Sequence, residues 1–211
     1  MATVVREKSQ LAVFHEVRWE TYLALLADEE MQRGRMAYDE GTLEIMSPSM
    51  NHEIIKTTIG RLIETLGLEL DLDIIGAGST TLTRFDLKRS VEPDECYYFH
   101  DVQHARETGQ LSLPDDPPPE LVIEVDLSSS RIRQSIYAKL GIAESWRFAK
   151  NRLAMYRLQA DGQYLEVERS VVLPQLTAAD LTRFLALRET LNEAQIVRQF
   201  RDWIRENFGA K

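Results

Sequence analysis

The sequence predicts an α/β fold, with a mixed β-sheet at the centre and helices packed around it. Apolar runs typical of strands alternate along the chain with segments whose apolar residues recur at helical spacing. The 211 residues are 44% hydrophobic and 28% charged, which supplies enough apolar material for one sizeable core. No repeat, low-complexity tract or linker divides the sequence. We therefore expect residues 1–211 to form a single domain.

The composition argues against several classes of function. The formal net charge of −9 argues against a protein that coats DNA without specificity, which would be basic. The single cysteine, Cys96, excludes an internal disulfide and a cysteine-based zinc site. No apolar run approaches the length of about 20 residues that spans a membrane, and residues 1–10 lack the apolar core of a signal peptide. We therefore expect a cytoplasmic protein without a membrane partner.

The first third of the chain contains an edge segment, two helices and a hairpin. Residues 1–15 are expected to form an arm or an edge segment, and residues 17–30 have the apolar spacing of a helix. Residues 33–46 have the pattern of a hairpin with its turn at residues 39–41, Asp-Glu-Gly. A Ser-Pro-Ser sequence then introduces a long helix that extends to about Leu70.

The rest of the chain alternates between strands and helices. A polar stretch at residues 101–119 is expected to be a loop, and a helix at residues 131–140 ends at Gly141. Two C-terminal helices are expected within about residues 177–208. The last of them has an apolar stripe that is either core or a dimer face, formed by Ile196, Phe200, Trp203, Ile204 and Phe208. Strands are predicted at residues 71–76, 80–83, 95–99, 120–126, 144–149, 152–159 and 164–169.

The strand at residues 120–126, Glu-Leu-Val-Ile-Glu-Val-Asp, carries two acids within an apolar run. Because side chains alternate along a strand, Val122, Glu124 and Asp126 share one face, while Leu121, Ile123, Val125 and Leu127 share the other. Two like charges at the edge of a core repel each other and are costly to desolvate. A divalent cation would offset this cost, because hard cations bind carboxylate oxygens.

A second acidic motif lies upstream, where Glu92-Pro93-Asp94 precedes a predicted strand. The rigid proline places Asp94 at the entrance of that strand. If this strand neighbours the strand at residues 120–126, Asp94, Glu124 and Asp126 can converge on one cation. The two motifs therefore form a candidate metal site.

The spacing of these motifs resembles that of the PD-(D/E)xK nuclease superfamily, in which Pro-Asp is followed, on the next strand, by Asp/Glu-x-Lys. The wider chain resembles one branch of it, the Uma-two family of bacterial restriction-endonuclease-like proteins. The resemblance covers about residues 15–170. It is carried, in family order, by residues 46–53, 78–81, 92–98, 119–126 and 136–147.

The resemblance implies a restriction-endonuclease-like core at about residues 15–170, followed by the C-terminal helices. It implies that Asp94 and Glu124 bind Mg²⁺ or Mn²⁺, with Asp126 as a further candidate ligand and Glu53 as an acid supplied by the long helix. The lysine position of the motif is occupied by Asp126, and Arg133 stands in from the following helix.

The substrate-binding residues follow from the same resemblance and from charge. Arginine stays protonated and hardly acts as a base, so Arg133, together with Arg131, is expected to hold a phosphate. His52, beside Glu53, is a further candidate for contact with the substrate. Residues 131–158 hold seven basic residues and one acidic residue, which form either a solvated face or a contact surface for a polyanion.

The function expected from these residues is metal-assisted hydrolysis of DNA phosphodiester bonds, with Mg²⁺ or Mn²⁺ as cofactor and a homodimer as a plausible assembly. Two alternatives stay open. The acidic composition and the missing lysine favour a nuclease fold without catalysis, kept as a binding or assembly module. A hydrolase of a small phosphorylated substrate would also use such a site, and overall charge gives no sign of a DNA footprint.

Overall fold

The computed structural model describes residues 9–28, 34–108, 111–126 and 132–209. Within these ranges it contains two sheets, not the single central sheet that the sequence pattern predicted. One sheet has five strands in the order β1-β3-β2-β6-β5, and the other has six in the order β11-β10-β9-β8-β7-β4. The six-stranded sheet is mixed, because β8 and β9 are parallel while its other pairs are antiparallel.

The five-stranded sheet comes from the N-terminal half of the chain, and the six-stranded sheet mostly from the C-terminal half. The first comprises β1 (Gln10–Phe14), β2 (Arg35–Asp39), β3 (Thr42–Ser47), β5 (Leu82–Arg84) and β6 (Arg89–Val91). The second comprises β4 (Ile75–Gly76), β7 (Glu95–Tyr98), β8 (Leu121–Val125), β9 (Glu144–Ala149), β10 (Arg152–Leu158) and β11 (Tyr164–Val167).

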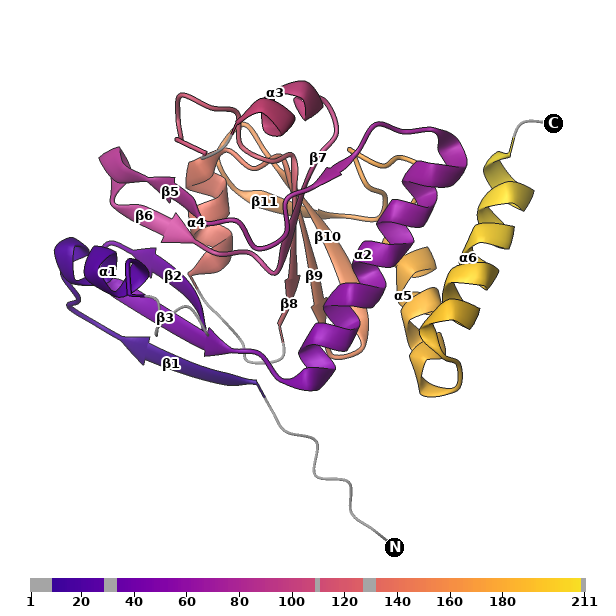
Figure 1. Cartoon of the computed structure of the whole chain (residues 1–211), viewed down its shortest axis with the longest axis horizontal. Helices are drawn as coiled ribbons and strands as arrows, with labels where there is room; N and C mark the ends of the chain where they lie inside the picture. Colours follow the sequence, from indigo (N-terminus) through magenta and orange to yellow (C-terminus); the bar gives the residue numbers. More distant parts are fainter. Residues whose placement is uncertain (1–8, 29–33, 109–110, 127–131, 210–211) are drawn as a thin grey trace, which may run out of the picture.

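The helices pack on these sheets in layers (Figure 1). Helices α2, α5 and α6 cover one face of the six-stranded sheet, α4 lies against its other face, next to the five-stranded sheet, and α1 covers the far face of the five-stranded sheet. Their bounds are α1 (Trp19–Leu26), α2 (Met50–Leu70), α3 (Val102–Glu107), α4 (Arg133–Leu140), α5 (Ala178–Ala186) and α6 (Glu193–Phe208). Two short 3₁₀ helices are η2 (Phe85–Leu87) and η3 (Leu187–Glu189).

The largest core lies between α2, α6 and the six-stranded sheet. Ile59 of α2 and Ile123 of β8 are fully buried there together with Phe200 of α6. Full burial of one such side chain contributes roughly 1.5–3 kcal/mol. Because Ile196 and Ile204 are also fully buried in this core, and Trp203 and Phe208 pack against it, the apolar stripe of the last helix is part of the core.

Local sequence signals explain several element boundaries. Gly41 has φ of 99°, which a side chain would disfavour, and it closes the β2–β3 hairpin where the turn was predicted. The Ser49 hydroxyl accepts a hydrogen bond from the His52 backbone and caps α2. Thr177 and Asp180 form a capping box at the start of α5.

Some elements differ from the predicted ones. Strand β6 was not predicted, since three residues are too few for a periodic pattern. Helix α3 lies within residues 101–119, which were predicted to be a loop, and of residues 71–76 only β4 is a strand. No helix in the described ranges is long and apolar enough to cross a membrane.

Candidate active site

Strands β7 and β8 bring the two acidic motifs together. The strands are antiparallel, with Glu95 opposite Ile123, so the start of β7 lies beside the end of β8. Asp94 immediately precedes β7, and its Oδ2 accepts a hydrogen bond of 2.7 Å from the backbone N–H of Val125. The side chains of Asp94 and Glu124 therefore lie in one region, as expected for neighbouring strands.

The two faces of β8 are divided as the alternation predicted. Leu121, Ile123 and Val125 belong to the core beneath α2, while Val122 packs in the second core with α4. Glu124 also faces α4, because its partners lie on that helix. Leu127 was assigned to the first face and lies outside the described residues.

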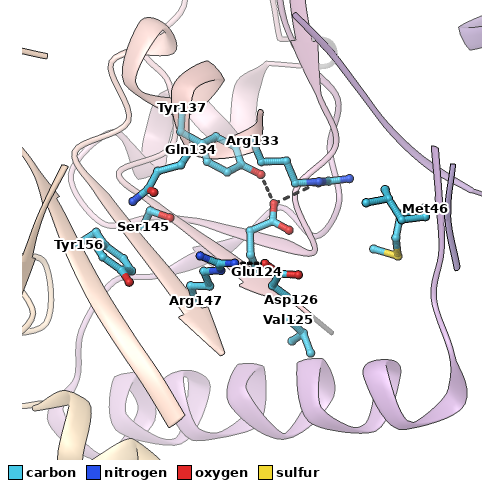
Figure 2. Close-up of a pocket in the computed structure, with 11 residues that line it drawn as sticks. Met46, Glu124, Val125, Asp126, Arg133, Gln134, Tyr137, Ser145, Arg147 and Tyr156 are labelled. Carbon is cyan, nitrogen blue, oxygen red and sulfur yellow. Dashed lines mark hydrogen bonds and ion pairs between the residues drawn. The ribbon is translucent and has the colours of Figure 1, made fainter. Parts of the chain in front are cut away.

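Glu124 is a buried carboxylate held by helix α4. Its Oε1 accepts a hydrogen bond of 3.1 Å from Nη1 of Arg133 and another from the hydroxyl of Tyr137 (Figure 2). These two residues are four positions apart, so they lie on the same face of α4. Burial raises the pKa of Glu124 to about 7, a rise that Arg133 opposes and the nearby Asp94 carboxylate reinforces. A carboxyl with such a pKa changes its protonation near neutral pH.

Arg133 is buried and only partly satisfied. Its Nη1 also donates a hydrogen bond of 2.6 Å to the backbone carbonyl of Glu92. Its Nη2 is buried and has no hydrogen-bond partner among the described residues. A buried guanidinium N–H without an acceptor is costly, so this nitrogen is suited to bind an anion that enters the site.

Asp94 is fully buried and surrounded by donors. Its Oδ1 accepts a hydrogen bond of 2.8 Å from Nη1 of Arg35, and Nε2 of His52 lies 3.0 Å from Oδ2. Burial alone would raise the pKa of Asp94, but the His52 ring and the positive charges of Arg35 and Arg133 outweigh it and lower that pKa. Asp94 is therefore an ionised carboxylate with compensated charge.

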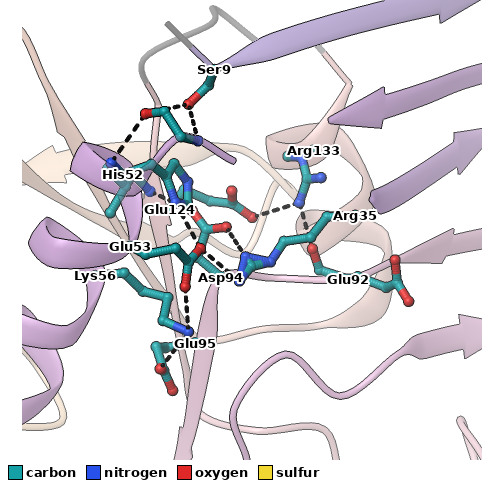
Figure 3. A network of polar contacts seen from close by, with 12 residues as sticks. Ser9, Arg35, His52, Glu53, Lys56, Glu92, Asp94, Glu95, Glu124 and Arg133 are labelled. Carbon is teal, nitrogen blue, oxygen red and sulfur yellow. Dashed lines mark hydrogen bonds and ion pairs between the residues drawn. The ribbon is translucent and has the colours of Figure 1, made fainter. Parts of the chain in front are cut away.

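Arg35 connects Asp94 to Glu53 (Figure 3). It lies at the start of β2 in the five-stranded sheet, and its Nη2 donates a hydrogen bond of 3.1 Å to Oε1 of Glu53. The same oxygen lies 3.2 Å from Nδ1 of His52, and Lys56 lies 3.2 Å from Oε2. With 39% of its side chain exposed, Glu53 is the most accessible acid of this network.

A pocket of about 250 Å³ lies beside Glu124. Met46 lies on one side of Glu124, and Ser145, Arg147 and Tyr156 lie on the other (Figure 2). Asp126 lines the pocket just after the end of β8 and forms an ion pair with Arg147 of β9. The lining residues are Leu11, Met46, Glu124, Val125, Asp126, Arg133, Gln134, Tyr137, Ser145, Arg147 and Tyr156.

The structure thus assembles most of the site residues expected from the sequence. Asp94, Glu124, Glu53, Arg133 and His52 contact one another or share a partner. His52 has no exposed surface and contacts the carboxylates of Asp94 and Glu53, so in this arrangement it offers no surface for direct contact with a substrate. The remaining expected residues are Asp126, which is paired with Arg147, and Arg131, which lies outside the described residues.

Two residues of the site were missed by sequence reasoning. Arg35 resembles an ordinary basic residue at the start of a hairpin, and its partners are 18 and 59 positions away. Tyr137 was taken as core, and it is fully buried, but its hydroxyl binds Glu124. Its spacing of four residues from Arg133 was the signal available for it.

The carboxylates do not form a ready metal site. Within the ranges that the structure describes, no group of three or more His, Cys, Asp or Glu side chains is arranged to hold a metal ion. The donor set is right in type, since Asp94, Glu53 and Glu124 offer the oxygens that hard cations bind. However, both carboxylate oxygens of Asp94 already accept hydrogen bonds, so they are not free to bind an ion in this arrangement.

A mixed sheet flanked by helices, with acids at adjacent ends of two central strands, defines a restriction-endonuclease-like fold. A family model agrees with this class: the Uma2 family, described as a putative restriction endonuclease, matches residues 19–192. The chain belongs to the Uma2 family, which confirms the resemblance found in the sequence.

Comparison with solved structures supports the fold. The chain is similar to a putative nuclease belonging to DUF820 from Anabaena variabilis ATCC 29413, with a TM-score of 0.54 and 15% sequence identity. The match covers 80% of this chain and 99% of the other. No curated protein matches the chain.

Proposed function

We propose that the chain is a divalent-metal-dependent endonuclease that hydrolyses phosphodiester bonds of DNA. The observation that supports this most is the buried pair Asp94 and Glu124 beside Arg133, at adjacent strand ends. Buried carboxylates are uncommon outside functional sites, and a carboxyl with a pKa raised to about 7, like that of Glu124, is typical of an active site. Membership of a family described as a putative restriction endonuclease points the same way.

Asp94, Glu124 and Asp126 would hold the ion, with Glu53 beside it, and the donor type suits Mg²⁺ or Mn²⁺. When bound, the ion would supply polarisation of a phosphoryl oxygen and a more acidic water. The present hydrogen bonds of Asp94 and the Asp126–Arg147 pair would have to change for these oxygens to bind it.

Other residues of the chain would bind and orient the substrate. Arg133 would donate a charged hydrogen bond from Nη2 to a phosphate oxygen, and Arg131, two positions earlier in the sequence, would add positive charge. Glu53, which is partly exposed, would orient a water molecule. The basic residues of the stretch 131–158 would contact the phosphodiester backbone.

Two other functions are each favoured by one observation. The ion pairs of Arg35 with Asp94 and of Arg147 with Asp126 favour a nuclease fold without catalysis that serves as a binding or assembly module. The pocket of about 250 Å³, lined by Arg133 and Arg147, favours hydrolysis of a small phosphorylated substrate.

Incubation of the purified protein with supercoiled plasmid and with single-stranded DNA tests the proposal. We expect cleavage in Mg²⁺ or Mn²⁺, no cleavage in EDTA, and loss of cleavage in Glu124→Gln and Asp94→Asn. Asp73→Asn, in an exposed ion pair with Arg106, is the control that should cleave like the wild type. Cleavage that survives in Glu124→Gln, or none under any condition, contradicts the proposal. Hydrolysis of bis(p-nitrophenyl) phosphate without DNA cleavage would favour the small-substrate alternative.

A further inference from the structure

Arg35 lies where two acids of the candidate site face each other. Its guanidinium is 2.8 Å from Oδ1 of Asp94 and 3.1 Å from Oε1 of Glu53, and only 13% of its side chain is exposed (Figure 3). A guanidinium matches carboxylates well, because its planar N–H groups donate in parallel. Arg35 therefore supplies a fixed positive charge between the two acids.

We propose that Arg35 is a built-in counter-ion that competes with a divalent cation for the carboxylates of Asp94 and Glu53. The inference rests on the proposed function, in which Asp94 binds the ion. In the metal-free protein, Arg35 neutralises the site. When an ion binds, the hydrogen bond between Arg35 and Oδ1 of Asp94 breaks. The free energy needed to break this hydrogen bond lowers the apparent affinity for the ion.

The geometry at Asp94 leads to this competition. Its Oδ2 already accepts the backbone N–H of Val125 at 2.7 Å, which leaves Oδ1 as the oxygen to bind an ion. A divalent cation binds a carboxylate oxygen at about 2.0–2.6 Å. A guanidinium hydrogen-bonded to that same oxygen would lie close enough to repel the ion, so each cation weakens the binding of the other at Oδ1.

The polar network around Asp94 is also incomplete, which is consistent with a second arrangement. Nη2 of Arg133, whose positive charge also acts on Asp94, is buried without a hydrogen-bond partner among the described residues. Buried polar atoms are normally paired. A rearrangement in which Arg35 leaves Asp94 would change the surroundings of this nitrogen.

Direct measurement of metal binding tests the inference without relying on catalysis. Mn²⁺ is titrated into the wild type and into Arg35→Gln by isothermal calorimetry, after dialysis against EDTA and then against metal-free buffer. Loss of the competitor should tighten Mn²⁺ binding by about tenfold or more, because charge-assisted hydrogen bonds no longer have to break. The variant should also have a lower Tm in EDTA and a larger increase of Tm in Mn²⁺ than the wild type.

Arg89 provides a matched control in the same sheet. It bridges Asp39 and Glu40 at 2.7 and 2.8 Å with 11% of its side chain exposed, and these acids are not among the candidate metal ligands. Arg89→Gln should bind Mn²⁺ like the wild type. Arg35→Lys keeps the charge as a single point without the planar pair of donors, so it should bind Mn²⁺ with an affinity between those of the wild type and Arg35→Gln.

The outcomes separate this inference from the function on which it rests. If the wild type binds Mn²⁺ and Glu124→Gln does not, but Arg35→Gln binds equally or more weakly, Arg35 is a structural residue and the inference is wrong. If neither the wild type nor any variant binds Mn²⁺, the metal-dependent function and the inference both fail. Should Arg35→Gln not fold, the side-chain NMR signals of Arg35 in the wild type should shift on addition of Mg²⁺, and their invariance in a protein that binds Mg²⁺ would overturn the inference.

Discussion

Replacement of Glu124 with glutamine should change the way in which stability depends on pH. The pKa of Glu124 is raised from 4.5 to about 7, chiefly because the carboxyl is buried. Between these pH values the carboxyl is ionised in the unfolded chain but protonated in the folded one. Unfolding then releases a proton, so the free energy of unfolding falls as the pH rises through this window.

The size of this effect follows from the same two values. The difference between 4.5 and about 7 corresponds to about 3 kcal/mol of stability lost between acidic and weakly alkaline pH. Glutamine is neutral at every pH, and its carbonyl oxygen can still accept hydrogen bonds from Arg133 and Tyr137. Because the unfolded carboxyl is still partly protonated at pH 5, the stability of Glu124→Gln relative to the wild type should increase by about 2–3 kcal/mol from pH 5 to pH 8.

Urea unfolding at both pH values, in EDTA, measures this difference. Titrating groups that do not contact Glu124 are common to both proteins and cancel in the comparison. The control is Glu166→Gln, whose side chain is 47% exposed and whose relative stability should vary by less than about 0.5 kcal/mol. If the relative stability of Glu124→Gln is the same at pH 5 and pH 8, the carboxyl does not titrate as the geometry implies.

Three further substitutions test the packing and the polar network. Arg133→Met should lower the free energy of unfolding, measured with urea at pH 8, by about 3–5 kcal/mol, because it removes the ion-pair partner of the buried Glu124 carboxylate. A loss below about 1 kcal/mol would contradict the burial of this pair. Ile59→Ala should lower the free energy of unfolding by about 2–5 kcal/mol, because Ile59 is fully buried in the main core. Leu68 is 81% exposed on the same helix, so Leu68→Ala should lower it by less than about 0.5 kcal/mol. Equal losses in the two variants would contradict the orientation of α2. Thr177→Ala should cost about 1 kcal/mol through loss of the capping box of α5, and Thr177→Ser should recover most of it in the same assay.

Features of the fold with strong local signals could be predicted from the sequence. The β2–β3 hairpin followed from its turn at Gly41, and α2 from a long apolar stripe behind a serine cap. Strand β8 followed from its short apolar run, and the assignment of its faces followed from the alternation of side chains along a strand. In each case the residues that determine the element lie next to one another in the chain.

Features that depend on distant partners could not be predicted. The separation of the strands into two sheets depends on β6, whose three residues pair with β2 across about 50 positions. The contact of Arg35 with Asp94 spans 59 positions and crosses from one sheet to the other. The site was therefore predicted as a set of acids that needs a cation, whereas the structure places an arginine among them.

The origin of Arg35 in the five-stranded sheet has a consequence for folding. If that sheet melted first, Asp94 would lose the Arg35 guanidinium, one of the groups that compensate its charge, while its carboxylate stayed within the packed remainder of the chain. Removal of one partner from a buried ion pair costs about 3–5 kcal/mol, so a half-melted intermediate of this kind is disfavoured. We therefore expect the two sheets to unfold in one cooperative transition, and a chain divided just before α2 to yield no stable half.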